Sequence, residues 1–487
     1  MAHGIGKHAF TAALAALLAT VASAGPIEIG ARLEPLVDRH LIESLDGTEL
    51  RLHQPVPREI AITYDAPWEG NTSCYVTVFQ DEGRFRMYYR GSGYNLEDGS
   101  YSKQFVCYAE SQDGVTWTKP ELGLIEFEGS KANNIVWDGM GVHNFAPFKD
   151  TNPDCKPEER YKALAGGEKK GLVAFTSPDG IHWNLVSEEP VITNGAFDSQ
   201  NLAFFDNTRG RYVDFHRGFK DGVRHIMTCT STDFRTWTEP EWVDFGDTPD
   251  EHLYTNATTP SPGAPHIFLA FPKRFMPDRQ SAVHPIKGVS DGVFMTSRDG
   301  MRWDRWREAL IRPGAQDSRW VNRNNMIAWG ILPTAAALPD TPDEWSIYAT
   351  EGYYVGPCHL RRYSIRQHGF VSVHAGGETG SFVTKPIVFS DDPAVSIPVP
   401  GQETPAKTAL LLNFATSGAG VIRCEILDAN HVAIPGFRLD QCDEIFGDSL
   451  EQAVTWNGGA ELKSLAGTPV RLRFELFDAD LYAIRFQ

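Results

Sequence analysis

The sequence predicts an all-β protein, a five-bladed β-propeller followed by a β-sandwich, and three observations carry this prediction. A Ser-x-Asp-x-x-x-Trp phrase occurs four times, at 111–117, 177–183, 231–237 and 297–303. Short alternating runs bounded by Gly, Asp, Asn and Pro fill the chain, whereas long helical periodicity is nearly absent. Each phrase closes a unit of about three such runs, and the units of roughly 55 to 70 residues suit propeller blades with insertions.

The expected strands can be read unit by unit. The first unit contains SCYVTVF, RFRMYYR and QFVCYAE, and the second contains YKALAG and LVAFTS. The third contains NLAFFD, RYVDFHR and RHIMTCT, and the fourth contains HIFLAF and GVFMTS. A fifth unit, with NMIAWGI, EWSIYAT and LRRYSIRQHGFVSV, lacks the Trp phrase and ends near Ala375. A pair of β-sandwiches is the alternative, but it does not explain a turn phrase repeated at blade spacing.

These units set the expected domain boundaries. The propeller should span 25–385. A Pro-rich change of composition over 386–407 indicates a connector, and the strand-patterned remainder, 408–487, has about the size of a β-sandwich module.

Residues 1–24 have the pattern of an export signal. Lys7 and His8 precede an apolar run, and Ala22-Ser23-Ala24 supplies a small-x-small cleavage pattern. The run is shorter than the roughly 20 apolar residues needed to span a bilayer. We therefore expect cleavage after Ala24 and a mature protein that is secreted or periplasmic, with no membrane span.

Composition narrows the classes of partner and cofactor. The net charge of −18 argues against a nucleic-acid partner, because phosphate binding needs clustered Lys and Arg. The sequence has no Gly-rich phosphate loop, CxxC pair or HExxH motif, so we expect no cofactor and assign no metal ligands. The seven cysteines leave at least one unpaired, and Cys424 with Cys442 is the pair to test first.

The repeated phrase predicts a structural turn. Asp and Ser side chains can accept backbone N–H bonds within a tight turn, Gly tolerates positive φ, and Trp buries a large apolar area between blades. The phrase falls between the third and fourth strands of a blade. Since the first strand runs down the channel, these turns belong to the lower face. The starts of first strands and the ends of second strands belong to the upper face, where the site should lie.

The turn phrase and the two-module plan resemble the five-bladed β-propeller glycoside hydrolases, the superfamily that includes families 32, 43, 68 and 130. The family-32 plan of a propeller followed by a β-sandwich covers essentially the whole mature chain. The resemblance implies a glycosidase, with a calcium ion on the channel axis as an alternative that no visible ligand set supports. In family 32 the nucleophile, a stabilising Asp and an acid Glu come from the first three blades. The corresponding stretches here read WEGN, HNFAPF and FDSQN, so the match is partial.

The predicted catalytic residues are three carboxylates at first-strand starts: Glu69, Asp198 and Glu251. Glycoside hydrolysis needs two carboxyl groups that flank one bond. Glu251 is the choice for general acid, and either Asp198 or Glu69 would act as base or nucleophile. The predicted substrate-binding residues lie on the same face and are Trp68, Asn71, Arg90, His143, Asn144, His216, Arg217, His252, Lys273, Arg274, Asn324 and Glu351.

Basic residues at second-strand ends suggest an acidic substrate. Arg90, Arg217, Lys273 and Arg274 follow second strands in an otherwise acidic protein. Guanidinium groups bind carboxylate or sulfate groups with bidentate geometry. The sequence therefore predicts a secreted glycoside hydrolase that acts on a plant or algal glycan, acidic or sulfated. The alternatives are a glycan-binding propeller without catalysis and a polysaccharide lyase that uses a His or Tyr base against a uronate. The oligomeric state stays open.

Overall fold

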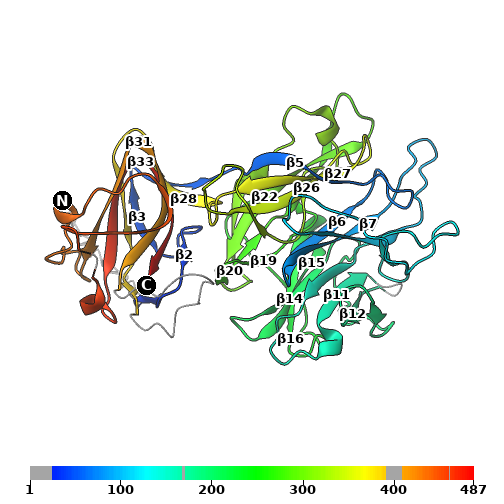
Figure 1. Ribbon diagram of the computed structural model, residues 1–487, viewed down its shortest axis with the longest axis horizontal. Coiled ribbons are helices and arrows are strands. Elements are labelled where there is room, and N and C mark those ends of the chain that lie inside the picture. The colour runs from blue at the N-terminus through cyan, green and yellow to red at the C-terminus, as the bar shows by residue number, and fades with distance from the viewer. Residues whose placement is uncertain (1–24, 167–169, 391–407, 460) are drawn as a thin grey trace, which may run out of the picture.

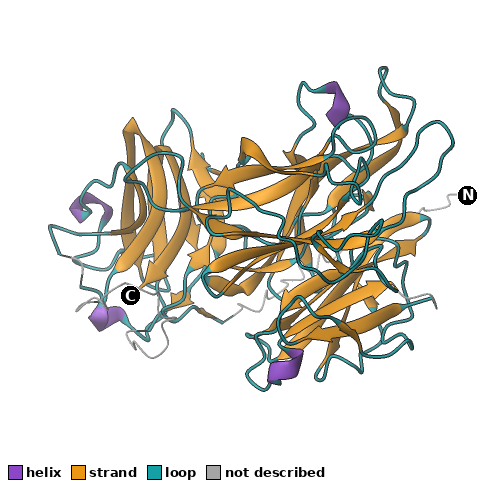
Figure 2. Cartoon of the chain, turned by 45° about the vertical axis from the view of Figure 1, so that its right-hand side comes forward, coloured by secondary structure: helices purple, strands orange, loops and turns teal. Residues whose placement is uncertain are grey.

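A computed structural model describes residues 25–166, 170–390, 408–459 and 461–487. The predicted signal peptide and most of the predicted connector lie outside these residues. Strands dominate the described part, which forms two lobes, a propeller and a sandwich (Figures 1 and 2). Its short 3₁₀ turns are Pro157–Glu159, Asp317–Arg319, Leu439–Gln441 and Lys463–Leu465.

The first three blades are regular four-stranded antiparallel sheets. The first consists of β6 (Cys74–Asp81), β7 (Arg84–Gly91), β8 (Phe105–Ser111) and β9 (Ile135–Trp137). The second consists of β10 (Ala146–Lys149), β11 (Tyr161–Gly166), β12 (Leu172–Ser177) and β13 (Asn184–Leu185). The third consists of β14 (Leu202–Asp206), β15 (Arg211–Lys220), β16 (Val223–Ser231) and β17 (Glu241–Trp242).

The fourth blade is extended at its upper end. Its strands are β19 (Thr259–Ser261), β20 (Ala264–Ala270), β22 (Lys287–Ser297) and β23 (Trp303–Ile311). Beyond β20 the chain continues as β21 (Lys273–Gln280), which pairs with β18 (His252–Leu253) and with the start of β22. The break falls at Pro272, which cannot donate to the ladder.

The fifth blade closes the ring with an N-terminal strand. It contains β24 (Met326–Ile327), β25 (Leu332–Thr334), β26 (Glu344–Glu351) and β27 (His359–Ile365). Its outermost strand is β5 (Val56–Thr63), which pairs with β27 and lies beside it in Figure 1. The five-bladed propeller predicted from the sequence is therefore confirmed, and its last blade is completed by residues far upstream.

The repeated phrases form equivalent turns on the lower face. Asp179 Oδ1 accepts hydrogen bonds from the backbone N–H groups of Ile181 and His182, at 2.8 Å each, and Ser177 Oγ accepts one from Gly180. Trp183 closes the turn, its indole N–H donating to Gly180 O at 3.0 Å. The first and fourth phrases repeat this pattern residue for residue.

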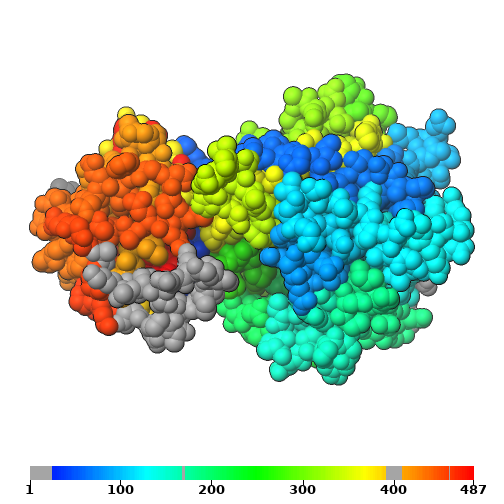
Figure 3. Space-filling model, viewed as in Figure 1, coloured from blue at the N-terminus to red at the C-terminus, as the bar shows by residue number. Residues whose placement is uncertain are grey.

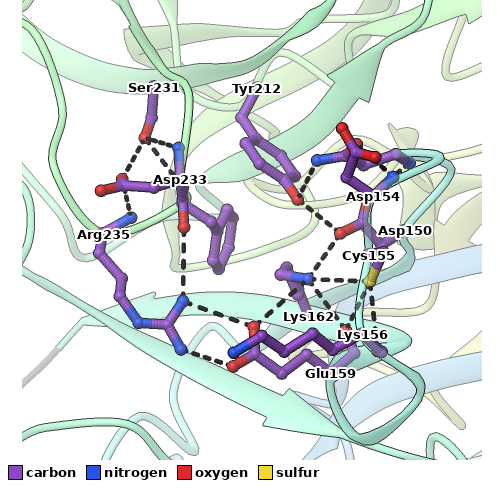
Figure 4. Close-up of polar contacts among 12 residues, drawn as sticks. Asp150, Asp154, Cys155, Lys156, Glu159, Lys162, Tyr212, Ser231, Asp233 and Arg235 are labelled. Atoms are coloured by element: carbon purple, nitrogen blue, oxygen red, sulfur yellow. Dashed lines mark hydrogen bonds and ion pairs between the residues drawn. The ribbon is translucent and has the colours of Figure 1, made fainter.

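Each turn packs against the neighbouring blade, as the sequence predicted. Trp183 meets Tyr88 of the first blade edge to face, with ring centroids 6.2 Å apart. In the third phrase Phe234 replaces the glycine and takes the buried position, while Trp237 is only half-buried. Figure 4 shows this turn, with Arg235 reaching Glu159 of the second blade.

The sandwich differs from its predicted boundaries. The long strands β31 (Leu410–Leu427) and β33 (Arg471–Phe486) pair with each other, and β32 (Asp448–Ala453) pairs with β31. The remaining strands come from segments assigned to the propeller: β2 (Glu34–Pro35), β3 (Ile42–Asp46), β4 (Glu49–Leu52), β28 (Val371–Ala375) and β29 (Gly380–Thr384). A parallel pair, β1 (Ile27–Glu28) with β30 (Ile387–Val388), adds to it.

The two lobes contact each other through a repeated turn and through aromatic rings. Arg298, in the fourth phrase, forms ion pairs with Glu34 at 3.0 Å and Asp38 at 2.7 Å. Phe370 of the sandwich side stacks on Phe294 of the fourth blade, with ring centroids 5.0 Å apart. The space-filling view shows the lobes in contact (Figure 3). The sandwich thus lies against the propeller, away from the upper ends of its strands.

Candidate functional site

The upper ends of the strands carry a set of cationic and aromatic side chains that contact one another. We call this set the channel cluster. All five blades contribute to it, and its members are Tyr75, Arg90, His143, Asp198, Arg217, Arg224, Tyr254, Lys273, Arg323 and Tyr353.

One half of the cluster is built around Arg90. Its guanidinium donates to the Tyr353 hydroxyl at 3.1 Å and to Thr72 O at 2.8 Å. It also hydrogen-bonds the His143 ring at 3.1 Å and lies 4.9 Å from the Tyr75 ring centroid. Arg90 lies at the end of β7, as predicted, and its side chain is buried among rings from three blades.

The other half is built around Tyr254. Arg323 donates to its hydroxyl at 3.1 Å. Lys273 Nζ lies 3.8 Å from its ring centroid and the Arg217 guanidinium 4.8 Å. Arg217 also forms an ion pair with Asp198.

The two halves join into a closed circuit. Arg323 bridges Tyr254 and Tyr353, donating to the latter at 2.7 Å. On the opposite side the Tyr75 hydroxyl donates to the backbone carbonyl of Asp198 at 3.2 Å. The contacts therefore run around the channel mouth without leaving the cluster.

Two members of this circuit and one neighbouring residue have unfavourable backbone conformations. Tyr75 has φ 54°, Arg323 has φ 68° and Tyr354 has φ 70°. Bulky residues rarely adopt this left-handed region, and such strain concentrates at functional sites. Arg323, in the turn 322–325, is one of these residues, and its side chain contacts the rings of Tyr254 and Tyr353.

The excess of positive charge changes the ionisation of its neighbours. Burial, with Arg90 and Arg323 nearby, lowers the pKa of His143 to about 3, so the imidazole is neutral. Burial and the same guanidinium of Arg323 hold the pKa of Lys273 well below its usual value. Burial alone would raise the pKa of Tyr254, but Arg323, the neighbouring Tyr75 hydroxyl and Arg217 outweigh it, so that pKa is lowered.

Arg217 retains donors that no described residue uses. Its side chain is 4% exposed, yet Nε and Nη1 have no hydrogen-bond partner among the described residues. A buried donor without a partner costs free energy comparable to a lost hydrogen bond. Its remaining nitrogen binds Asp198, whose side chain is 71% exposed. The free donors are suited to an anionic ligand.

The structure separates the three predicted catalytic carboxylates. Asp198 belongs to the channel cluster. Glu69 is buried in a different network, where Lys119 donates at 2.6 Å and the Tyr89 hydroxyl at 2.5 Å. Glu251 is half-buried and binds Arg274 at 3.2 Å and also Arg305 of the outermost strand β23. The described contacts therefore do not bring the three predicted carboxylates together: Glu69 and Glu251 are each paired with cations outside the channel cluster.

Three predicted asparagines shape the site through the backbone. Asn144 donates to the carbonyls of Phe197 and Ser199, which flank Asp198. Asn324 accepts from the Tyr353 N–H at 2.9 Å. Asn71 donates to Tyr354 O at 3.1 Å. These residues position the cluster, and their amides are engaged within the protein.

The remaining predicted binding residues are not members of the channel cluster. Trp68 donates to Asn134 at 2.8 Å, near Glu69. Arg274 binds Asp291 and Glu251. Glu351 is buried and accepts hydrogen bonds from His359, Arg361 and Tyr363. His252 lies at the rim, where its ring contacts Arg224 at 3.3 Å.

Sequence reasoning passed over Tyr75, Arg224, Tyr254, Arg323 and Tyr353. Tyr254 lies three residues after Glu251 and Arg323 directly before Asn324, two residues that the sequence placed on the upper face. The sequence therefore indicated the correct positions, but the residues predicted there were carboxylates and amides. Nothing in the sequence marks Tyr75 as turned inward.

One buried group could hold a metal ion, although the sequence assigned no metal ligands. The ligand atoms of Asp214, His216 and Cys229 lie within 4.8 Å of one another on β15 and β16. His216 Nδ1 bonds to Asp214, and Nε2 lies 2.9 Å from Asn194 O. Burial raises the pKa of the Asp214 carboxyl. The pair anchors the segment that leads to Asp198.

Comparisons with known proteins give distant similarities. No family model matches the chain. An uncharacterised protein of Mycobacterium tuberculosis is 27% identical over 152 residues, which are 28% of this chain and 44% of that protein. The chain thus spans less than half the length of that relative.

No helix among the described residues is long and apolar enough to cross a membrane.

Solved structures with a similar fold include a protein named glycoside hydrolase, 12% identical, with a TM-score of 0.44 over 64% of this chain and 92% of that one. The catalytic domain of an α-L-arabinofuranosidase from Coprinopsis cinerea is 11% identical, with a TM-score of 0.42 over 64% and 97%. An exo-β-1,3-galactanase from Phanerochaete chrysosporium is 10% identical, with a TM-score of 0.38 over 88% and 100%.

Proposed function

We propose that this protein is an enzyme that cleaves glycosidic bonds in an acidic glycan bound at the channel cluster. The observation that carries the proposal is the charge of that cluster. Four guanidinium groups and the Lys273 amine, whose pKa is lowered by burial and by Arg323, contact its rings, while Asp198 is the one carboxylate among its members.

The imbalance is specific to this place. The protein as a whole has a net charge of −18, and elsewhere in the described part of the chain buried Lys and Arg side chains have carboxylate partners, as Arg298 has Glu34 and Asp38. Placing like charges together without partners is unfavourable in a partly buried site. A carboxylate or sulfate on a sugar would relieve the repulsion and satisfy the free donors of Arg217.

The members differ in their access to solvent. Arg90, Arg217 and Lys273 are buried. His143, Arg224 and Arg323 are partly exposed, and Asp198 is exposed. Phe219, 49% exposed, lies beside Arg217 and Arg224 and offers an apolar ring face.

The decisive experiment is a screen of purified glycans with products identified by mass spectrometry. Uronate-bearing and sulfated polysaccharides are compared with neutral ones of similar linkage. The proposal expects shorter products from at least one acidic glycan. Binding without cleavage would identify a glycan-binding propeller instead. Neither binding nor cleavage of any acidic glycan would overturn the proposal. Export to the medium or periplasm, predicted from residues 1–24, remains a prediction.

A further inference from the structure

Resting on this proposed function, we further propose that the cluster cleaves a uronate-bearing glycan by β-elimination, with Tyr254 as the base. The substrate class is a polysaccharide in which the broken bond joins the oxygen at C4 of a hexuronate to that sugar. The inference rests on the cationic groups that surround Tyr254 and on the lack of a second carboxylate in the channel cluster that could act with Asp198 in hydrolysis.

The surroundings of Tyr254 suit a phenolate. Its hydroxyl accepts a hydrogen bond from Arg323, and its backbone N–H bonds to Lys273 O at 2.8 Å. Four cationic groups lie within 5.6 Å of its ring centroid, from β15, β16, β21 and the turn before β24. The titratable and charged groups that face it are Arg217, Arg224, Lys273, Arg323 and Tyr75.

The cations lower the pKa of Tyr254 and so support this role. Burial alone would raise the pKa of the phenol, but Arg323, Tyr75 and Arg217 lower this pKa by more. A base is most effective when its pKa lies near the working pH. His143, whose pKa is about 3, adds no further positive charge near neutrality.

Hydrolysis by a carboxylate pair lacks its second member. Such hydrolysis needs two carboxyl groups about 5 to 9.5 Å apart across the bond. Asp198 is the carboxylate of the cluster, and it is bound to Arg217. Glu69 and Glu251 are occupied by Lys119, Arg274 and Arg305. Elimination needs instead a base and cations that neutralise the uronate carboxylate, and the cluster supplies both.

The step balances without a co-reactant. The Tyr254 phenolate removes the proton from C5, and the cations stabilise the negative charge that spreads onto the uronate carboxylate. The C4–O bond then breaks, its electron pair leaves with the oxygen, and a C4–C5 double bond forms. The departing oxygen takes up the proton that Tyr254 removed, which regenerates the phenolate. No water is consumed and nothing is oxidised or reduced.

The test uses the full chain and a set of uronate polysaccharides, each paired with its carboxyl-reduced, neutral counterpart. The expected product carries an unsaturated uronate, detected by ultraviolet absorbance, and a mass without added water. The carboxyl-reduced polymers should not be cleaved. Tyr254→Phe should lower kcat by about 10²- to 10⁴-fold, the usual contribution of a positioned base. Tyr101→Phe, an exposed tyrosine, is the matched control.

Each outcome decides between the two proposals. A product mass that includes one water would overturn elimination and leave glycan cleavage standing. Full elimination activity in Tyr254→Phe would overturn the role of Tyr254. A loss of folding in that variant is checked by its melting temperature, and titration of tyrosine absorbance in wild type and variant gives an independent readout. The assignment of Tyr254 as the base fails if Tyr254→Phe does not remove a phenol that titrates below the ordinary range of tyrosine.

Discussion

Replacing Trp183 by Ala tests whether the repeated phrase is structural. The side chain is 6% exposed and meets Phe145 and Tyr88, with ring centroids 4.9 and 6.2 Å away. Truncating a buried Trp costs about 3–5 kcal/mol, because apolar contacts are lost and a cavity remains. The indole hydrogen bond to Gly180 O is removed together with its donor. We expect the free energy of unfolding to fall by about 4 kcal/mol.

The assay is unfolding in denaturant, with activity normalised to folded protein. Trp320→Ala is the control, because that Trp is 38% exposed. Trp237→Ala should cost less than Trp183→Ala, since Phe234 takes the buried position in the third phrase and the Trp237 indole N–H has no partner among the described residues. A Trp183→Ala protein with wild-type stability and no activity would refute the structural interpretation of the phrase.

Three further predictions address charge. Arg217→Ala should raise KM for an acidic glycan far more than for a neutral one, and equal effects in steady-state kinetics would contradict the anionic ligand. Glu69→Gln should destabilise the fold by about 1–3 kcal/mol, because Lys119 loses a buried carboxylate but keeps Asp65 at 3.0 Å. The activity per folded molecule should be retained, and a stable but inactive variant would indicate that Glu69 is catalytic. Although burial opposes it, bonding to His266 and the charge of Arg298 lower the pKa of Glu34 from 4.5 to about 2. This depressed pKa stabilises the fold above pH 4.5 by about 3 kcal/mol, which should be lost as the pH falls toward 2; acid unfolding of Glu34→Gln should lack this dependence.

The fold followed from local patterns, whereas the module boundary did not. The Trp phrases are local turns whose hydrogen bonds join neighbouring residues, so their form could be inferred from a few letters. The strand at 42–46 pairs with β29, more than 330 residues away in the sequence, and the strand at 371–375 pairs with β33, about a hundred residues away. Local alternation in a sequence predicts a strand but not its partner. The closure of the fifth blade by β5 was missed for the same reason.

At the site, the sequence indicated the face and several cations but not how each charge is paired. Arg90, Arg217 and Lys273 were placed by counting strand ends, and all three contact the channel cluster. The carboxylates were chosen by the same count. Whether Glu69 and Glu251 are free for catalysis depends on Lys119 and Arg305. Lys119 lies between the third and fourth strands of its blade, and Arg305 lies in the fourth strand of its own. No pattern at first-strand starts contains that information.

Pairing is also what distinguishes a site from a structural charge in this propeller. A buried carboxylate with a full set of donors, such as Glu351 with His359, Arg361 and Tyr363, has no capacity left for a ligand. Arg217 differs because two of its nitrogens are buried and unused. Since leaving such donors unpaired is costly, they are tolerated where a ligand completes them. The charge that the protein leaves uncompensated is positive, so its ligand should be an anion.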